Sequence, residues 1–289
     1  MDLEDWTAAG QHLDTDDGDV FVVDLPAIDH EVGPPLVFLH GFPTCSFDLR
    51  HVVGSLRQHR RIVTFDQLGF GLSSKPDRRY GIHLHADTAE AVLAALGIEQ
   101  IDLLTHDMGD TVGGELLARD LEGRLGVGIR RRVLTNGSIY IDLAQLTTGQ
   151  QLLMGLPDAA IDPLDADTFA AGVAATFAPG ATVPDDELAS IARLGEHGGG
   201  LGLLPRTIRY LEDRYADEER FTGAIERHPA PLGVVWGTED PVAIVTMTDR
   251  LLARRPDTPT TRLEGVGHYP MIEAPAAFAA AVLEHLDGP

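Results

Sequence analysis

Short apolar runs alternate with helix-like segments along most of this chain of 289 residues. The runs lie at 36–40, 61–71, 101–106, 131–137, 231–237 and 260–265. Segments such as 86–96 have helical composition and separate the runs. Strands that are apolar on both faces are typical of parallel sheets covered by helices. We therefore predict an α/β fold, with a mostly parallel central sheet flanked by helices.

The alternation lapses between about residues 141 and 228. This stretch is rich in Ala, Leu, Asp and Gly, and its pieces at 186–194 and 205–221 look helical. Because the strand-helix alternation then resumes, the stretch reads as an insertion into one parallel domain. We predict a core domain formed by 1–140 and 229–289, and a helical cap domain at 141–228.

Composition limits the partners and the compartment. Hydrophobic residues make up 44% of the chain, which suffices for one large core. No apolar run reaches the length of about 18 residues that a membrane span needs, and the acidic N-terminus does not resemble a signal peptide. Cys45 is the single cysteine, and the formal charge is −23. We expect a cytoplasmic protein that binds neither nucleic acid nor membranes.

Reactive side chains follow the ends of several predicted strands, where the active sites of parallel sheets lie. The most telling is the turn Thr105-His106-Asp107-Met108-Gly109, which has the spacing of the G-x-S-x-G nucleophile turn with aspartate at its tip. Asp240 and His268 follow two later strands, in GTEDP and GHYP. The chain order is therefore nucleophile, acid, histidine. As alternatives, either aspartate could only cap a helix, and His268 could be structural.

Aspartate at the tip of the turn suits attack on a saturated carbon. A serine would form an ether there, which water does not readily cleave, whereas a carboxylate forms an ester, which water does cleave. A carboxyl group with a reference pKa of about 3.9 is also ionised at neutral pH without a base. We predict that Asp107 forms an alkyl ester, that His268 activates the water that cleaves it, and that Asp240 orients His268.

Five motifs together resemble the epoxide hydrolase and haloalkane dehalogenase branch of the α/β-hydrolase fold. They are HGFPTCSFD, DQLGFGLSSKP, LLTHDMGD, GTEDPV and GHYPMIEAP, and they extend from about residue 36 to the C-terminus. Within the branch, the chain is most similar to the mesoderm-specific-transcript group. The resemblance implies an oxyanion hole formed by the backbone N–H groups of Phe42 and Met108.

The same resemblance bears on the leaving group. Haloalkane dehalogenases commonly hold halide with a Trp after the nucleophile and an Asn in the HG-x-P turn, where this chain has Met108 and Phe42. Epoxide hydrolases usually protonate the leaving oxygen with two cap tyrosines. Tyr210 is expected to be that acid, with Tyr140 as a second donor, although either could be an aromatic residue at the edge of the core. We also assign Tyr140, His40 and Pro43 to substrate binding.

We therefore predict an epoxide hydrolase that converts a small apolar organic substrate and water to a vicinal diol, without a cofactor or a metal. One alternative is a haloalkane dehalogenase with an atypical halide site. The other is a catalytically weak, ligand-binding relative. The intact set of Asp107, Asp240 and His268 argues against a pure binder, which has no need of all three.

Overall fold

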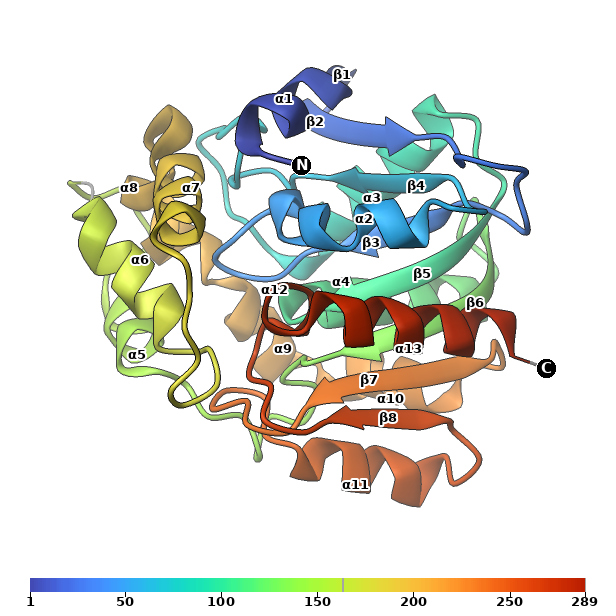
Figure 1. The fold of residues 1–289 in the computed structure, drawn as a ribbon. Coiled ribbons are helices and arrows are strands. Elements are labelled where there is room, and N and C mark those ends of the chain that lie inside the picture. The colour runs from blue at the N-terminus through green and yellow to red at the C-terminus, as the bar shows by residue number, and fades with distance from the viewer. Residues whose placement is uncertain (163, 289) are drawn as a thin grey trace.

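The computed structural model describes residues 1–162 and 164–288. Its centre is a sheet of eight strands in the order β1-β2-β4-β3-β5-β6-β7-β8 (Figure 1). The strands are β1 (Gly10–Thr15), β2 (Gly18–Leu25), β3 (Leu36–Leu39), β4 (Ile62–Phe65), β5 (Gln100–His106), β6 (Gly128–Thr135), β7 (Leu232–Gly237) and β8 (Thr260–Leu263). Strand β2 is antiparallel to β1 and β4, whereas β4, β3, β5, β6, β7 and β8 run parallel to one another. The predicted fold class is confirmed.

Helices cover both faces of the sheet because the central strands are apolar throughout: every residue of β3, β4 and β7 is buried. Helix α13 (Pro275–Asp287) packs on β6, β7 and β8, whereas α3 (Ile82–Ala95), α4 (Met108–Leu121) and α10 (Glu218–Arg227) lie on the other side (Figure 1). Helix α3 begins at Ile82, earlier than the predicted 86. The remaining elements outside the insertion are α1 (Leu3–Ala9), η1 (Ser46–His51), α2 (Val53–Leu56), α11 (Thr246–Arg254) and α12 (Pro270–Glu273).

The segment between β6 and β7 is helical, as its composition predicts, but its helices occupy two places. Four of them stand together at the carboxyl ends of the parallel strands: α5 (Thr148–Gly155), α6 (Ala166–Ala174), α7 (Asp185–Glu196) and α8 (Gly200–Thr207), with the short η2 (His197–Gly199) before the last (Figure 1). By contrast, α9 (Tyr210–Ala216) packs against α3, and α10 packs against α4. Part of the interval 141–228 therefore covers the sheet, and the domain boundary at 228 stays a prediction.

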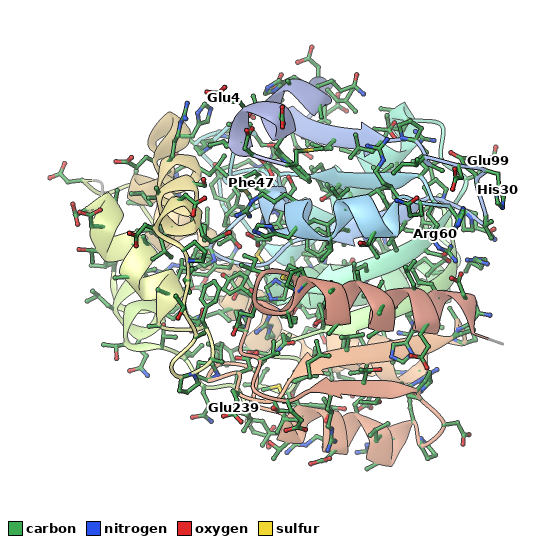
Figure 2. The ribbon with its side chains drawn as sticks, in the orientation of Figure 1. Glu4, His30, Phe47, Arg60, Glu99 and Glu239 are labelled. Carbon is green, nitrogen blue, oxygen red and sulfur yellow. The ribbon has the colours of Figure 1, made fainter. Side chains whose placement is uncertain are left out.

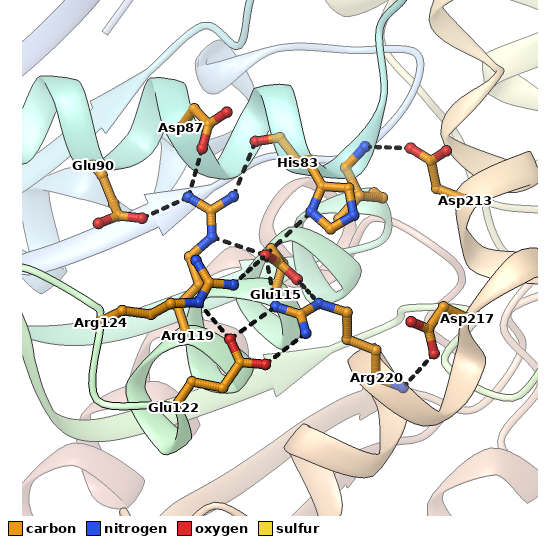
Figure 3. A network of polar contacts seen from close by, with 11 residues as sticks. His83, Asp87, Glu90, Glu115, Arg119, Glu122, Arg124, Asp213, Asp217 and Arg220 are labelled. Carbon is orange, nitrogen blue, oxygen red and sulfur yellow. Dashed lines mark hydrogen bonds and ion pairs between the residues drawn. The ribbon is translucent and has the colours of Figure 1, made fainter.

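A polar network fixes α4 to the helices beside it (Figure 3). At its centre the fully buried carboxylate of Glu115 accepts hydrogen bonds from Nε of Arg119 at 2.8 Å and Nε of Arg220 at 2.5 Å. Arg119 also contacts Asp87 and Glu90 of α3, and Arg220 belongs to α10. Helix α4, which follows the turn at Asp107, is thereby held on two sides.

The N-terminal helix α1 closes one end of the core. The ring of Trp6 packs edge-on against Phe47, with 5.9 Å between centroids, and Phe47 is labelled in Figure 2. Both side chains are almost fully buried. None of the helices within residues 1–162 and 164–288 combines the length and apolar character needed to cross a membrane.

Candidate active site

The turn between β5 and α4 has the backbone of a nucleophile elbow. Asp107 adopts φ 51° and ψ −115°, a conformation that non-glycine residues rarely adopt and that surrounding structure must maintain. Gly109 permits it, because a Cβ there would lie 2.2 Å from the carbonyl oxygen of Leu39. The sharp turn and the close approach of β3 together fix the direction of the Asp107 side chain.

A backbone N–H group of the loop after β3 holds the Asp107 carboxylate. Its Oδ1 accepts a hydrogen bond from the Phe42 N–H at 2.8 Å. Met108 is the first residue of α4, so its N–H has no acceptor within the helix. Gly41 lies so close that a Cβ there would be 2.5 Å from Cβ of Asp107. Of the two N–H groups expected to form an oxyanion hole, that of Phe42 contacts the carboxylate from the loop after β3, and that of Met108 belongs to the elbow itself.

His268 lies between two buried carboxylates. Its Nδ1 is 2.8 Å from Oδ2 of Asp240, and its Nε2 is 3.7 Å from Oδ2 of Asp107. Because the carboxylate accepts, Nδ1 carries the proton. Burial alone lowers the pKa of His268, but the charge and hydrogen bond of Asp240, with the charges of Asp107 and Glu273, outweigh it and raise the pKa to about 9. The three residues predicted to act together are brought together.

Asn136, which the sequence analysis did not single out, anchors Asp240. It has φ 47°, its Nδ2 donates to Oδ2 of Asp240 at 2.7 Å, and its Oδ1 accepts from the Gly237 N–H at 2.9 Å. The other oxygen of Asp240 accepts from two backbone N–H groups, those of Val242 and Ala243. The position of Asn136 just after β6 was the sequence signal that could have identified it, because polar residues at strand ends line such sites. Glu239, labelled in Figure 2, is exposed, whereas Asp240 is buried.

Glu273 was missed as well, although it lies within the motif GHYPMIEAP. Its Oε2 accepts from the N–H groups of Gly267 and Ala178, both at 2.9 Å, and its Oε1 accepts from the Tyr269 N–H at 3.0 Å. The His268 N–H donates to the carbonyl oxygen of Thr176. The loop that carries His268 is thus hydrogen-bonded directly to the segment that follows α6.

An apolar cavity of about 190 Å³ opens beside the histidine. Phe42, Pro43, His268 and Tyr269 line it from the core side. Apolar side chains of α5 and α6 line it from the other side, among them Leu153, Phe169 and Val173. Such a lining favours a small apolar ligand. Within residues 1–162 and 164–288, no group of three or more His, Cys, Asp or Glu side chains is arranged to hold a metal ion.

Tyr210 is the first residue of α9 and is 1% exposed. Its ring centroid lies 5.8 Å from that of Phe42. Burial, and next the negative charge of Asp107, raise the pKa of Tyr210, so the phenol is neutral and within electrostatic reach of the elbow. Tyr269 is a second buried phenol: it lines the cavity, and its ring stands edge-on to His268 with centroids 5.0 Å apart.

Tyr140 and His40 lie away from the cavity lining. The Tyr140 hydroxyl donates to Oε1 of Glu226 at 2.8 Å, and its ring belongs to a second apolar cluster with Trp236. In His40, Nδ1 bonds the carbonyl oxygen of Gly41 and Nε2 accepts from the Gln67 N–H at 2.9 Å, so both ring nitrogens support the loop before Phe42. The substrate-binding role expected for these two residues stays a prediction without support from this geometry.

Comparison with known proteins agrees with this architecture. The chain matches the alpha/beta hydrolase family over residues 36–281. It is 38% identical to the Mycobacterium tuberculosis protein named LipZ over 98% of each chain. It is 30% identical to the mesoderm-specific transcript homolog protein of Bos taurus, over 97% of this chain and 87% of that protein.

Solved structures share the fold. A haloalkane dehalogenase loop variant from Bradyrhizobium elkanii superposes with a TM-score of 0.75 over 96% of each chain, at 19% sequence identity. The resemblance predicted from the motifs is confirmed, and this chain belongs to the alpha/beta hydrolase family.

Proposed function

We propose that the protein is an epoxide hydrolase that works through an alkyl ester of Asp107. One observation carries the proposal. An aspartate occupies the tip of a positive-φ turn, with Oδ1 held by the Phe42 N–H at 2.8 Å and Oδ2 3.7 Å from Nε2 of His268. A carboxylate in this position forms an ester with a saturated carbon, and a histidine beside it can activate the water that cleaves the ester.

In the first step, Oδ2 of Asp107 attacks a ring carbon of the epoxide. The bond between that carbon and the epoxide oxygen breaks, and the oxygen takes the phenolic proton of Tyr210. The products are a hydroxyalkyl ester on Asp107 and the phenolate of Tyr210. Oδ1, held by the Phe42 N–H, becomes the carbonyl oxygen of the ester.

In the second step, His268 removes a proton from water, and the hydroxide attacks Cγ of Asp107. The N–H groups of Phe42 and Met108 stabilise the negative oxygen of the tetrahedral intermediate. The carbon–oxygen bond to the alkyl group's oxygen breaks, the diol leaves with the proton of the new carboxyl group, and the proton on His268 returns to the phenolate of Tyr210. Asp240 stabilises the imidazolium throughout this step.

The surroundings of Asp107 support an oxygen leaving group over a halide. Met108 and Phe42 supply no side-chain N–H where dehalogenases commonly have one. The Trp236 indole N–H donates to the carbonyl oxygen of Ala243 at 2.9 Å, and Trp6 packs against Phe47, so neither tryptophan lines the cavity. Tyr210 is likewise not among the residues that line the cavity, and neither is Asp107, but Tyr210 supplies a buried neutral phenol packed against Phe42, whose N–H holds Asp107.

The experiment incubates the protein with a styrene-oxide-type epoxide and, separately, with a panel of bromoalkanes, and measures diol and bromide release. We expect diol and no bromide. Tyr210→Phe should lower diol formation by about 100-fold, within the range for loss of a general acid. Tyr269→Phe is the matched control: loss of diol in that variant alone would transfer the acid's role to Tyr269.

Two other functions are outcomes of the same experiment. Bromide release without diol would make the protein a haloalkane dehalogenase with an atypical halide site. Silence on both panels would favour a ligand-binding relative with little activity. A His268→Gln variant separates slow turnover from none, because an inactive base should leave the alkyl ester on Asp107, where peptide mass spectrometry detects it.

A further inference from the structure

Arg214 on α9 is a buried cation with an unusual set of partners. Its side chain is almost completely buried. Its Nε and Nη2 both donate to Oγ1 of Thr111, at 3.0 and 2.8 Å. Within residues 1–162 and 164–288, no carboxylate lies within 4.0 Å of its guanidinium. Burying a charge without an opposite charge nearby destabilises the folded state, so Arg214 is a candidate for a functional role.

The guanidinium of Arg214 lies between helix α4, which follows Asp107, and the phenol ring of Tyr210. Thr111 is four residues after Asp107 on α4, and the guanidinium carbon lies 5.1 Å from the centroid of the Tyr210 ring. Tyr210 and Arg214 are one helical turn apart on α9, so they share a face. A cation over an aromatic face is favourable, but weakly so compared with an ion pair.

Asp110 does not supply the missing countercharge. It lies more than 4.0 Å from the guanidinium, its Oδ1 accepts a hydrogen bond from the hydroxyl of Thr105 instead, and burial raises the pKa of its carboxyl group, which disfavours the charged form. Asp213, the neighbour of Arg214, bonds instead to Arg79 and to the Ile82 N–H at 2.9 Å; Figure 3 shows the latter bond. These bonds anchor α9 to the start of α3 and so hold Tyr210 and Arg214 in place.

The proposed reaction would supply the countercharge. When Asp107 becomes an ester it loses its negative charge, and the charge appears on the phenolate of Tyr210, beside Arg214. We propose that Arg214 is a positioning residue for Tyr210 that stabilises the phenolate formed as the epoxide opens; this rests on the proposed function. The O–H bond of Tyr210 breaks, its proton goes to the epoxide oxygen, and its electron pair stays on the phenolate. Arg214 itself neither gains nor loses a proton.

This arrangement favours the transition state over the resting state. In the resting protein, burial and then the charge of Asp107 raise the pKa of Tyr210, Arg214 lowers it, and Tyr215 adds a smaller upward effect. Alkylation removes the effect of Asp107 and leaves that of Arg214. An interaction that strengthens as the reaction proceeds raises the rate of the chemical step rather than substrate affinity.

The test measures single-turnover alkylation by a styrene-oxide-type epoxide in a His268→Gln background, where the ester accumulates. Arg214→Met removes the charge and keeps most of the side-chain stem, and we expect it to slow alkylation by about 100-fold. Arg214→Lys should retain the rate within about 10-fold, because it restores a cation. Thr111→Val, which removes the partner of the guanidinium and not the charge, should give an intermediate loss.

The decisive comparison is a double-mutant cycle with Tyr210→Phe. If Arg214 acts through the phenol, adding Arg214→Met to Tyr210→Phe should cause little further loss, whereas a merely structural role would lower both rates by the same factor. Additive losses, or no effect of Arg214→Met, would overturn the inference while leaving the epoxide hydrolase proposal standing. Absence of both diol and adduct with His268 intact and replaced would overturn both. Circular dichroism spectra matching the parent show that each variant is folded.

Discussion

Nδ1 of His268 and Oδ2 of Asp240 lie 2.8 Å apart, and both side chains are buried. The pair is not isolated, because Asn136 donates to the same oxygen of Asp240 and backbone N–H groups occupy the other. With all its acceptor positions used, Asp240 has a single orientation. It can therefore fix both the tautomer and the position of the histidine.

This pair predicts the pH dependence of ester cleavage. His268 acts as a base only when neutral, and its pKa of about 9 in the resting protein is raised in part by Asp107. Esterification removes that charge, so the pKa of His268 should be lower in the ester than in the resting protein. The rate of ester breakdown should therefore rise with pH, with an apparent pKa below about 9, and become constant at higher pH. The decay rate of the alkyl-enzyme in single-turnover experiments from about pH 6 to about pH 10 measures this dependence. Asp240→Asn should shift the profile to lower pH and slow the step, and a rate independent of pH would contradict the assignment.

The covalent step predicts where an oxygen atom from water appears. In a single turnover in ¹⁸O-water, the label should enter the carboxyl group of Asp107 and not the diol, because water attacks the carbonyl carbon of the ester. Mass spectrometry of the peptide that contains Asp107 and of the product checks both. Label in the first-turnover diol would mean that water attacks the epoxide directly.

Two glycine substitutions, one a test and one a control, probe how tightly the loop that contains Gly41 and Phe42 packs against Asp107. In Gly41→Ala the new methyl group would lie 2.5 Å from Cβ and 2.9 Å from Oδ1 of Asp107, so the loop must move away from the carboxylate. We expect breakdown of the alkyl ester to slow by about 100-fold, as for loss of one oxyanion donor. Gly54→Ala is the matched control, because nothing lies within 4 Å of a Cβ there. Equal activity of the two variants would contradict the placement of the loop.

Asp48 predicts a pH-dependent stability. Burial, opposed by the hydrogen bond from Thr44 and by Arg50, raises its pKa from 3.8 to about 7. The folded state therefore binds a proton that the unfolded state has released, and stability falls as the pH rises from about 4 to about 7. Asp48→Asn should remove this loss, so the substitution should be more favourable by about 4 kcal/mol at pH 8 than at pH 4. Urea unfolding at both pH values measures it; the same effect at both would contradict the raised pKa.

Glu115 predicts a large loss of stability. Replacing this fully buried carboxylate by Gln leaves Arg119 and Arg220 without their shared anion, which should cost about 3 kcal/mol in the free energy of unfolding. The control is Glu219→Gln, whose carboxylate pairs with Arg227 at the surface and should change stability by less than about 1 kcal/mol. Similar losses in the two variants would show that the network in Figure 3 is not a buried anchor.

The order of the motifs predicted the fold and the gathering of Asp107, Asp240 and His268, because parallel strands bring their carboxyl ends to one edge of the sheet. Tyr210 and Tyr140 could not be placed the same way. Both lie outside the strands, and their directions depend on how the inserted helices pack. Of the two, Tyr210 packs against Phe42, whereas the Tyr140 hydroxyl bonds to Glu226.

By itself, then, the sequence determined the sheet, the elbow and the three charged residues, since local patterns of apolar runs, glycines and turns are sufficient to specify them. The tertiary structure alone decided which side chains support and surround them. Asn136 reaches Asp240 across 104 positions of sequence, and Arg214 reaches Thr111 across 103. Contacts between residues so far apart follow from the packing of whole elements, and no local pattern encodes them.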